Sequence, residues 1–376
     1  MMRRQELPTP CYIMDEAKLR SNLELLRHVE QESGAHILLA QKAFSCFALY
    51  PMMAEYVSGT TASGLYEARL GAEEFRKENH VFSPAFEPAE FAELCRICDH
   101  ISFNSFTQLE KYRPVWEKAG VSVGIRVNPE CSTQGDHAIY DPCAPGSRLG
   151  VTRKNFRPEL LKGVEGLHFH TLCEQNADAL ITTWAAFEEK FGEYLPQMKW
   201  LNLGGGHHVT REDYDVSALI SLIKDIRAKY GVTVYLEPGE AFALNAGYLD
   251  TEVMDIVEND IKILILDASA ACHMPDVLEM PYRPPLKDAG EKGEKAYDYR
   301  LSARTCLAGD IIGDYSFDRE IEVGDRLTFN DMAIYSMVKN NTFNGMPLPA
   351  IAVERENGEC EIIRQFTYED FKNRLS

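Results

Sequence analysis

The sequence predicts an α/β protein with a (β/α)8 barrel of the TIM type and a second domain of β-sheet. Eight short apolar runs alternate with amphipathic segments over roughly 200 residues, which is the pattern of such a barrel. The text after the eighth run is rich in β-forming residues, and 376 residues are more than one small core requires. An open, doubly wound parallel sheet is the alternative for the alternating part.

Each predicted barrel strand is a short apolar run before a segment of helical character. The segment SALISLIKDIRAKYG, for example, repeats apolar residues at helical spacing at Leu219, Leu222, Ile223 and Ile226, and Gly231 follows as a stop signal. The eight runs are HILLA from His36, TTAS from Thr60, VFS from Val81, HISFNS from His100, SVGIRV from Ser122, GLHFH from Gly166, WLNLGG from Trp200 and VTVYLEPG from Val232.

The longest interval, between the fifth and sixth runs, holds NPECSTQGDHAIYDPCAPGSRLG. In a barrel this loop follows a strand, so it belongs to the C-terminal face, where active sites are built. After the eighth run come β-rich segments such as IKILILDAS and DRLTFNDM, and the N-terminal PCYIMDE is expected to pair with them. We therefore predict a barrel over residues 25–240 and a β-domain formed by residues 1–24 and 241–376.

Composition excludes several classes of function. The chain has 39 Lys and Arg against 58 Asp and Glu, a net charge of −19 that repels nucleic acid. No apolar run approaches the ~18 residues of a membrane span, and no apolar run follows the N-terminal arginines as in a secretory signal. Ten scattered cysteines favour a reducing cytoplasm. Cys95 and Cys98 form a CxxC without a second pair, so no metal site is expected.

Lys42 follows the first barrel run and is flanked by apolar residues. A lysine at this strand end is either a surface residue whose stem lies along apolar side chains, or a desolvated amine able to form a Schiff base. Lys42 alone leaves both interpretations open.

Two later strand ends favour the second interpretation. Gly204, Gly205 and Gly206 follow the seventh run, and loops after strands seven and eight commonly bind phosphate, although three glycines also suit a simple turn. Glu237 follows the eighth run, where a carboxylate can keep a pyridine nitrogen protonated or pair with a neighbouring cation. His170 ends the sixth run and suits either stacking on a flat cofactor or a structural role.

Taken in order, these motifs resemble the pyridoxal phosphate-dependent decarboxylases of the alanine racemase fold, which include the ornithine and diaminopimelate decarboxylases. The resemblance covers nearly the whole chain. Within this group, GLHFHTLCEQ, LNLGGGHH, LEPGEA, CHMPDVLEMPYRP and CLAGDIIGDYSF are most similar to the carboxynorspermidine and carboxyspermidine decarboxylases.

The resemblance implies that Lys42 holds pyridoxal 5'-phosphate (PLP) as a Schiff base. It also implies a homodimer with shared active sites, in which Cys306 and Asp310 come from the partner subunit and Cys306 reprotonates the substrate carbon. The remaining implied cofactor contacts are His170 against the ring, Glu237 at the ring nitrogen, and Gly205, Gly206, Gly239 and Tyr335 around the phosphate.

One departure bears on the substrate. Members for ornithine and diaminopimelate typically read EPGR, whereas this chain has Glu240 in place of the arginine. Loss of a cation argues against the second carboxylate of diaminopimelate, and carboxylates suit the ammonium groups of a small cationic carboxypolyamine. The candidate carboxylates are Glu174, Glu240, Asp276, Glu279 and Asp310. His273 joins them because its segment is implied to be a loop near the site.

The predicted function is thus PLP-dependent decarboxylation of carboxynorspermidine or carboxyspermidine in polyamine biosynthesis. The alternatives are a decarboxylase of ornithine, lysine, arginine or diaminopimelate, and a PLP-binding protein without turnover. Carriers of that last kind consist of the barrel alone, so the β-domain with Cys306 argues against them. A racemase would require a tyrosine base where Cys306 stands.

Overall fold

The computed structural model describes residues 2–135 and 138–376, which divide into two compact units. One unit is Asn22–Phe242, and the other combines Met1–Ser21 with Ala243–Ser376. Residues 136–137, within the long loop expected on the active-site face, lie outside the described residues. Among the described residues, no helix has both the length and the apolar character that a membrane span requires.

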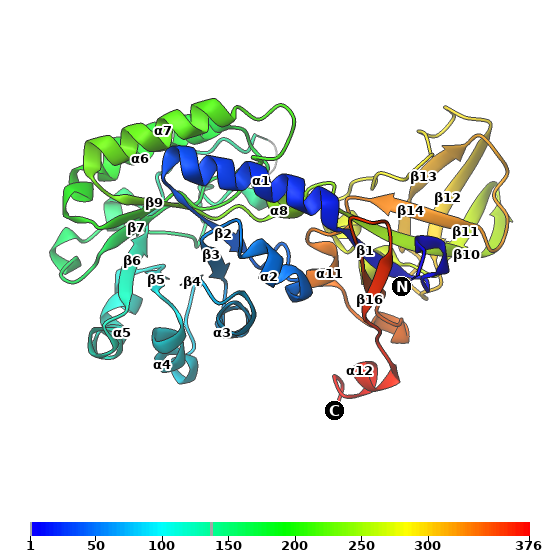
Figure 1. Ribbon diagram of the computed structural model, residues 1–376, viewed down its shortest axis with the longest axis horizontal. Helices are drawn as coiled ribbons and strands as arrows, with labels where there is room; N and C mark the ends of the chain where they lie inside the picture. Colours follow the sequence, from blue (N-terminus) through cyan, green and yellow to red (C-terminus); the bar gives the residue numbers. More distant parts are fainter. Residues whose placement is uncertain (1, 136–137) are drawn as a thin grey trace. The chain divides into compact units, whose positions relative to one another are not determined.

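The first unit contains a closed barrel of eight parallel strands (Figure 1). The predicted barrel is confirmed, and the open doubly wound sheet is wrong, because the first strand pairs with the last through His36 with Tyr235 and Ile37 with Leu236. The strands are β2 (His36–Ala40), β3 (Gly59–Ala62), β4 (Glu78–Phe82), β5 (His100–Phe103), β6 (Ser122–Arg126), β7 (Gly166–His168), β8 (Trp200–Asn202) and β9 (Thr233–Leu236).

The helix expected from the segment SALISLIKDIRAKYG is present and ends at the predicted stop signal, Gly231. Helix α7 (Val216–Tyr230) starts at Asp215, whose carboxylate accepts the N–H of Ala218 at 2.9 Å, and ends at Gly231 with φ +69°. The others are α1 (Glu16–Ser33), α2 (Tyr50–Met53), α3 (Leu65–Leu70), α4 (Pro88–Ile97), α5 (Phe106–Ala119), α6 (Ala177–Phe191), α8 (Glu240–Ala243), α9 (Ala270–His273), α10 (Asp276–Glu279), α11 (Ser336–Lys339) and α12 (Tyr368–Lys372).

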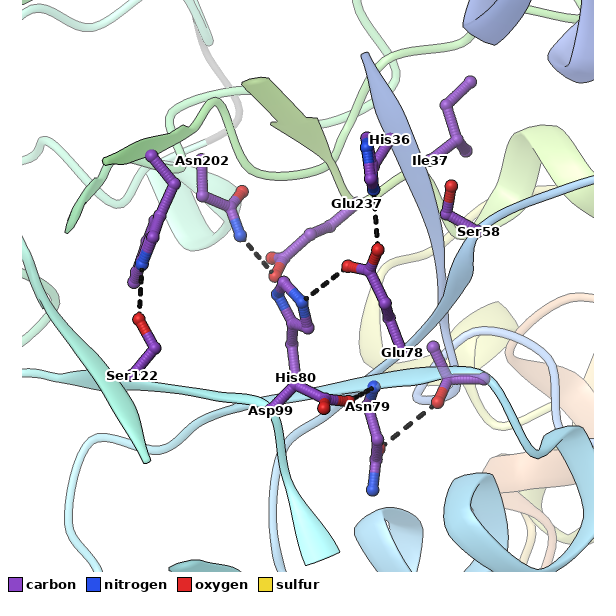
Figure 2. A network of polar contacts seen from close by, with 12 residues as sticks. His36, Ile37, Ser58, Glu78, Asn79, His80, Asp99, Ser122, Asn202 and Glu237 are labelled. Carbon is purple, nitrogen blue, oxygen red and sulfur yellow. Dashed lines mark hydrogen bonds and ion pairs between the residues drawn. The ribbon is translucent and has the colours of Figure 1, made fainter. Parts of the chain in front are cut away.

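The barrel interior is unusually polar. Side chains two apart on a strand share a face, so Gly166 and His168 both point inward on β7. Gly166 leaves the room that Trp200 fills, because a Cβ on this glycine would lie 2.0 Å from the indole. At the start of β2 and β4, the Glu78 carboxylate lies 2.7 Å from Nδ1 of His36 and 3.3 Å from Nε2 of His80 (Figure 2).

The second unit is a mixed sheet in which β1 is central. Strand β1 (Cys11–Asp15) pairs antiparallel with β10 (Gly247–Asn259) and parallel with β15 (Ala350–Glu354), which confirms that the N-terminal segment joins the C-terminal sheet. The sheet order is β13-β12-β11-β10-β1-β15-β16, with β14 also paired to β10. The other strands are β11 (Ile261–Leu266), β12 (Tyr297–Ala303), β13 (Ile311–Phe317), β14 (Arg326–Asn330) and β16 (Cys360–Arg364).

Candidate active site

Lys42 lies in the turn directly after β2, at the C-terminal end of the barrel. The N–H of Ala40 donates to Pro238 O at 3.1 Å and that of Gln41 to Thr61 O at 3.2 Å, so the turn is anchored to neighbouring strand ends. Gln41 and Ala43 are fully buried, whereas Lys42 is exposed. The two buried neighbours therefore fix the turn, while the side chain of Lys42 stays exposed.

Solvent reaches the Lys42 side chain, but the protein atoms around its amine still remove part of the hydration of this group. Burial lowers the pKa of Lys42, and the positive charge of Arg126 lowers this pKa further, while Glu237 opposes both. A larger neutral fraction makes the amine a better nucleophile, as a Schiff-base lysine requires. This environment favours the second interpretation of Lys42 over a simple surface role.

Glu237 follows β9 and is buried under the glycine loop. Its N–H donates to Gly204 O at 2.7 Å, and its Oε1 accepts from Nδ2 of Asn202 at 2.8 Å (Figure 2). Burial alone would raise the pKa of Glu237, but His168 and the Asn202 amide outweigh burial and hold this pKa below its usual range. The carboxylate is thus ionised at neutral pH and available to a protonated ring nitrogen.

His170 lies beside Glu237, two residues beyond the end of β7 rather than at the strand end expected from the sequence. Its Nδ1 accepts the N–H of Gly205 at 3.2 Å, and its carbonyl accepts from Nη2 of Arg126 at 3.1 Å. Burial, followed by the charges of Lys42 and Arg126, keeps the pKa of His170 well below its usual range. The ring is therefore neutral, and one polar side-chain atom from each of His168, His170 and Glu237 lies within 4.8 Å of the other two.

The glycines at the predicted phosphate site have no room for side chains. Gly206 has φ +81°, and a Cβ there would lie 2.0 Å from Leu172 O. A Cβ on Gly205 would lie 2.3 Å from Glu237 O, and one on Gly239 would lie 2.6 Å from the Ala43 Cβ. Glycine is thus required where the loops after β2, β7, β8 and β9 meet, and this close backbone packing fits a phosphate cradle.

Two of the candidate substrate carboxylates belong to the same part of the barrel. Glu174 is exposed with φ +51°, and Oε2 of Glu240 lies 3.8 Å from Nε2 of His208. Burial first, then the charges of Glu240 and Glu174, raises the pKa of the Cys173 thiol to about 12. Both carboxylates therefore act on the same thiol next to the glycine loop, and their assignment to the substrate remains a prediction.

In the sheet unit, Asp310 supports the segment that carries Cys306. The buried carboxylate accepts from Ser269 Oγ at 2.7 Å, Thr305 Oγ1 at 2.5 Å and the N–H of Ala271 at 3.1 Å. Cys306 itself is exposed, and its N–H donates to Oδ1 of Asn344 at 2.8 Å. The backbone of Cys306 is held in place while its thiol faces outward.

His273 is fully buried and supports its own loop. Its Nδ1 accepts the N–H of Ser269 at 3.2 Å, and its Nε2 lies 3.1 Å from Pro347 O. Burial lowers the pKa of His273 to about 4, so the ring is neutral at pH 7. Neither ring nitrogen is left for a ligand within this unit, and the expected contact of His273 with substrate remains a prediction.

Asp276 and Glu279 share an internal cation. The Lys339 ammonium forms an ion pair with Asp276 and another with Oε2 of Glu279 at 2.5 Å. Lys339 ends helix α11, and Tyr335, with φ +56°, comes directly before this helix. These pairs connect α10 to α11 and so to the tyrosine expected near the phosphate. The assignment of both carboxylates to substrate also remains a prediction.

Several residues around the site were missed by the sequence analysis. Arg126 could have been found as a charge inside the buried run SVGIRV, and His168 as the other histidine of HFH. The roles of Asn202, Asn344 and Lys339 depend on strand register and on contacts between loops, which leave no sequence signal.

The chain matches the family described as pyridoxal-dependent decarboxylase, C-terminal sheet domain, over residues 11–333. It is 44% identical to a carboxynorspermidine/carboxyspermidine decarboxylase of Campylobacter jejuni, over 98% of this chain and 99% of the relative. It is also 43% identical to a carboxyaminopropylagmatine decarboxylase of Synechocystis, over 99% of this chain and 97% of that one. The two relatives act on different substrates at nearly equal identity.

One of the solved structures to which this chain is similar is also a carboxynorspermidine decarboxylase. The structure of carboxynorspermidine decarboxylase from Campylobacter jejuni in complex with norspermidine superposes with a TM-score of 0.92 at 43% identity, covering 98% of this chain and all of that one. Both the barrel and the C-terminal sheet are therefore shared features.

Proposed function

Because the chain belongs to the family of pyridoxal-dependent decarboxylases, we propose that it converts carboxynorspermidine or carboxyspermidine to norspermidine or spermidine by removing the α-carboxylate. The observation that carries this proposal is the grouping of Lys42, His170, Glu237 and the glycine loop at one end of the barrel, with Glu174 and Glu240 beside them. A carboxypolyamine offers an amine to react and further ammonium groups to hold. The barrel supplies a partner for each.

PLP is the cofactor that these residues fit. Lys42 would hold it covalently, Glu237 would hold a proton on its ring nitrogen, His170 would lie against the ring, and the backbone of Gly205, Gly206 and Gly239 would hold its phosphate, with Tyr335 from the sheet unit. When bound, PLP accepts the electron pair that loss of CO2 leaves behind. The ionised state of Glu237 suits this role, because it keeps the ring nitrogen protonated.

The remaining chain groups bind the substrate and move one proton. Glu174 and Glu240 would hold an ammonium group through charge-assisted hydrogen bonds. The Cys306 thiol would deliver a proton to the substrate carbon after CO2 has left. The buried carboxylate of Asp310 would keep the Cys306 segment in shape rather than touch the substrate.

We further propose that the enzyme is a homodimer in which Cys306 serves the barrel of the partner subunit. Leu307 and Phe343, which flank Cys306 and its bonded neighbour Asn344, are 43% and 47% exposed. Large apolar side chains around a reactive thiol suit a surface that a second copy covers.

A second candidate substrate is carboxyaminopropylagmatine, which the Synechocystis relative decarboxylates. This compound carries a guanidinium group, which carboxylates bind as well as they bind ammonium. The experiment is to measure CO2 release from both carboxypolyamines, carboxyaminopropylagmatine, ornithine, lysine, arginine and diaminopimelate. The proposal expects the highest kcat/KM with a carboxypolyamine. A higher value with any amino acid of the panel would contradict it, and a higher value with carboxyaminopropylagmatine would select the second candidate.

A further inference from the structure

His168 is a buried polar residue that the proposed reaction leaves without a role. Its side chain is 1% exposed, and neither ring nitrogen has a hydrogen-bond partner. Leaving such a group unsatisfied costs free energy, so an imidazole persists here only if something requires it. The Phe82 ring stands edge-on to it with centroids 5.6 Å apart, so this neighbour offers no polar contact.

The carboxylate of Glu237 is a polar group close to the His168 ring. Nε2 of His168 lies 3.6 Å from Oε2 of Glu237, while Asn202 donates to Oε1 at 2.8 Å. His168 and Asn202 are paired in the register of the neighbouring strands β7 and β8, so their side chains lie on the same face of the sheet, toward the barrel interior. A shift of about 0.5 Å would turn the His168 contact into a hydrogen bond.

The charge state of His168 suits a donor that does not compete with the cofactor. Burial lowers the pKa of His168 to about 4, despite the opposing charge of Glu237, so the ring is neutral at pH 7. A neutral N–H supports a carboxylate without cancelling its charge. A cation in this place would instead pair with Glu237 and compete with a protonated ring nitrogen.

We propose that His168 is the positioning residue of Glu237, donating its Nε2–H to Oε2 so that the carboxylate stays ionised and aimed at the cofactor ring nitrogen. Asn202 performs the same task at Oε1, and its own Oδ1 is occupied by the N–H of Gly204 at 2.8 Å. The inference rests on the proposed function, because it assumes that PLP binds with its ring nitrogen at Glu237.

The test compares the binding of two ligands to the apo-protein, without any turnover. One ligand is PLP, and the other is its carbocyclic analogue with C–H in place of the ring nitrogen. We expect His168→Leu to weaken PLP roughly tenfold, as for a lost hydrogen bond to a charged group, and to leave the affinity for the analogue unchanged. His168→Gln retains an N–H donor and should recover most of the affinity for PLP.

His100→Leu is the matched control. This histidine is also inside the barrel, stacks on Trp200 at 4.8 Å, and has an unpartnered Nδ1. It should bind both ligands as the wild type does. Equal weakening of both ligands by His168→Leu would show a packing role and overturn the proposal, as would no effect on either ligand, or a His168→Gln variant that binds PLP as weakly as His168→Leu. A wild-type protein that binds neither ligand would instead refute the proposed function.

Discussion

The barrel unit contains buried side-chain nitrogens without a hydrogen-bond partner, whereas the buried polar residues behind Cys306 in the sheet unit have partners. In the barrel, the two ring nitrogens of His168 are buried without a hydrogen-bond partner, and Lys42 has an exposed side chain with a lowered pKa. In the sheet unit, Asp310 and His273 are equally buried, but each is hydrogen-bonded within the unit.

This difference indicates that the two sets of buried polar groups have different roles. Unsatisfied buried groups cost free energy, so their concentration at the barrel strand ends indicates a place for a ligand. Satisfied groups instead fix the conformation of the loops that they connect. The barrel is therefore suited to hold the cofactor, and the sheet unit is suited to present Cys306 in a fixed loop.

The largest expected effect is at the barrel lysine. Lys42→Ala should lower kcat/KM roughly a thousandfold or more, because no other amine takes its place at the end of β2. Lys199→Ala is the control, since Lys199 is largely exposed and forms only a surface ion pair with Glu165. Steady-state CO2 release measures both, and a Lys42→Ala enzyme with more than a few per cent of wild-type activity would assign the chemistry elsewhere.

The next effect tests whether the two units of different subunits cooperate. Dimers of Lys42→Ala chains and dimers of Cys306→Ala chains should each be nearly inactive. After mixing, mild denaturation and refolding, about half of the dimers are hybrids with one intact site of two, so roughly a quarter of wild-type activity should return. A verified hybrid population without recovered activity would refute the shared site.

Replacing a buried carboxylate and replacing an exposed one should have different effects on stability and activity. Asp310→Ala leaves one buried donor and two part-buried donors without their acceptor, and it should lower the free energy of unfolding by about 3 kcal/mol, measured by urea denaturation. Glu174→Gln should leave stability unchanged but lower kcat/KM for the carboxypolyamine roughly tenfold. If the two variants exchanged these effects, the roles assigned to the two units would be reversed.

The smallest expected effect is a change in how the free energy of unfolding depends on pH. Burial lowers the pKa of His168 and of His207 to about 4, so between pH 6.5 and 4 the unfolded chain binds protons that the folded barrel does not. The free energy of unfolding should therefore fall on acidification, by up to about 1.4 kcal/mol per pH unit for each histidine. His168→Gln should reduce this slope, and an identical slope in wild type and variant would show that His168 is protonated in the folded state.

The ion pair at the other end of the barrel contributes in a different window. Glu78 raises the pKa of His36, so the stability from this histidine is complete below pH 6.5 and is lost as pH rises through the raised value. The bonds from His36 and His80 overcome burial and lower the pKa of Glu78, so its contribution is present above about pH 4.5. Between these two pH values the contribution of this ion pair to the free energy of unfolding does not change. The pH dependence expected in that range therefore comes from the buried histidines.

Some of this organisation was readable from the sequence, and some was not. The barrel strands were found because each is a short apolar run, and Lys42 was found because apolar residues flank it. Strands β12 and β13 were missed as strands, since charged residues such as Arg300 and Asp314 interrupt them and pair with each other across the ladder. The difference between His168 and His273, both buried, depends on partners distant in sequence, which no local pattern shows.

The most direct test of the account is to find where PLP attaches. Borohydride converts the imine between PLP and a lysine into a stable secondary amine, which mass spectrometry of proteolytic peptides can locate in the wild-type protein. The account predicts one modified site, Lys42, in the peptide that follows β2. Modification at another lysine, or no modification of a protein that has taken up PLP, would contradict the assignment of the barrel end as the active site.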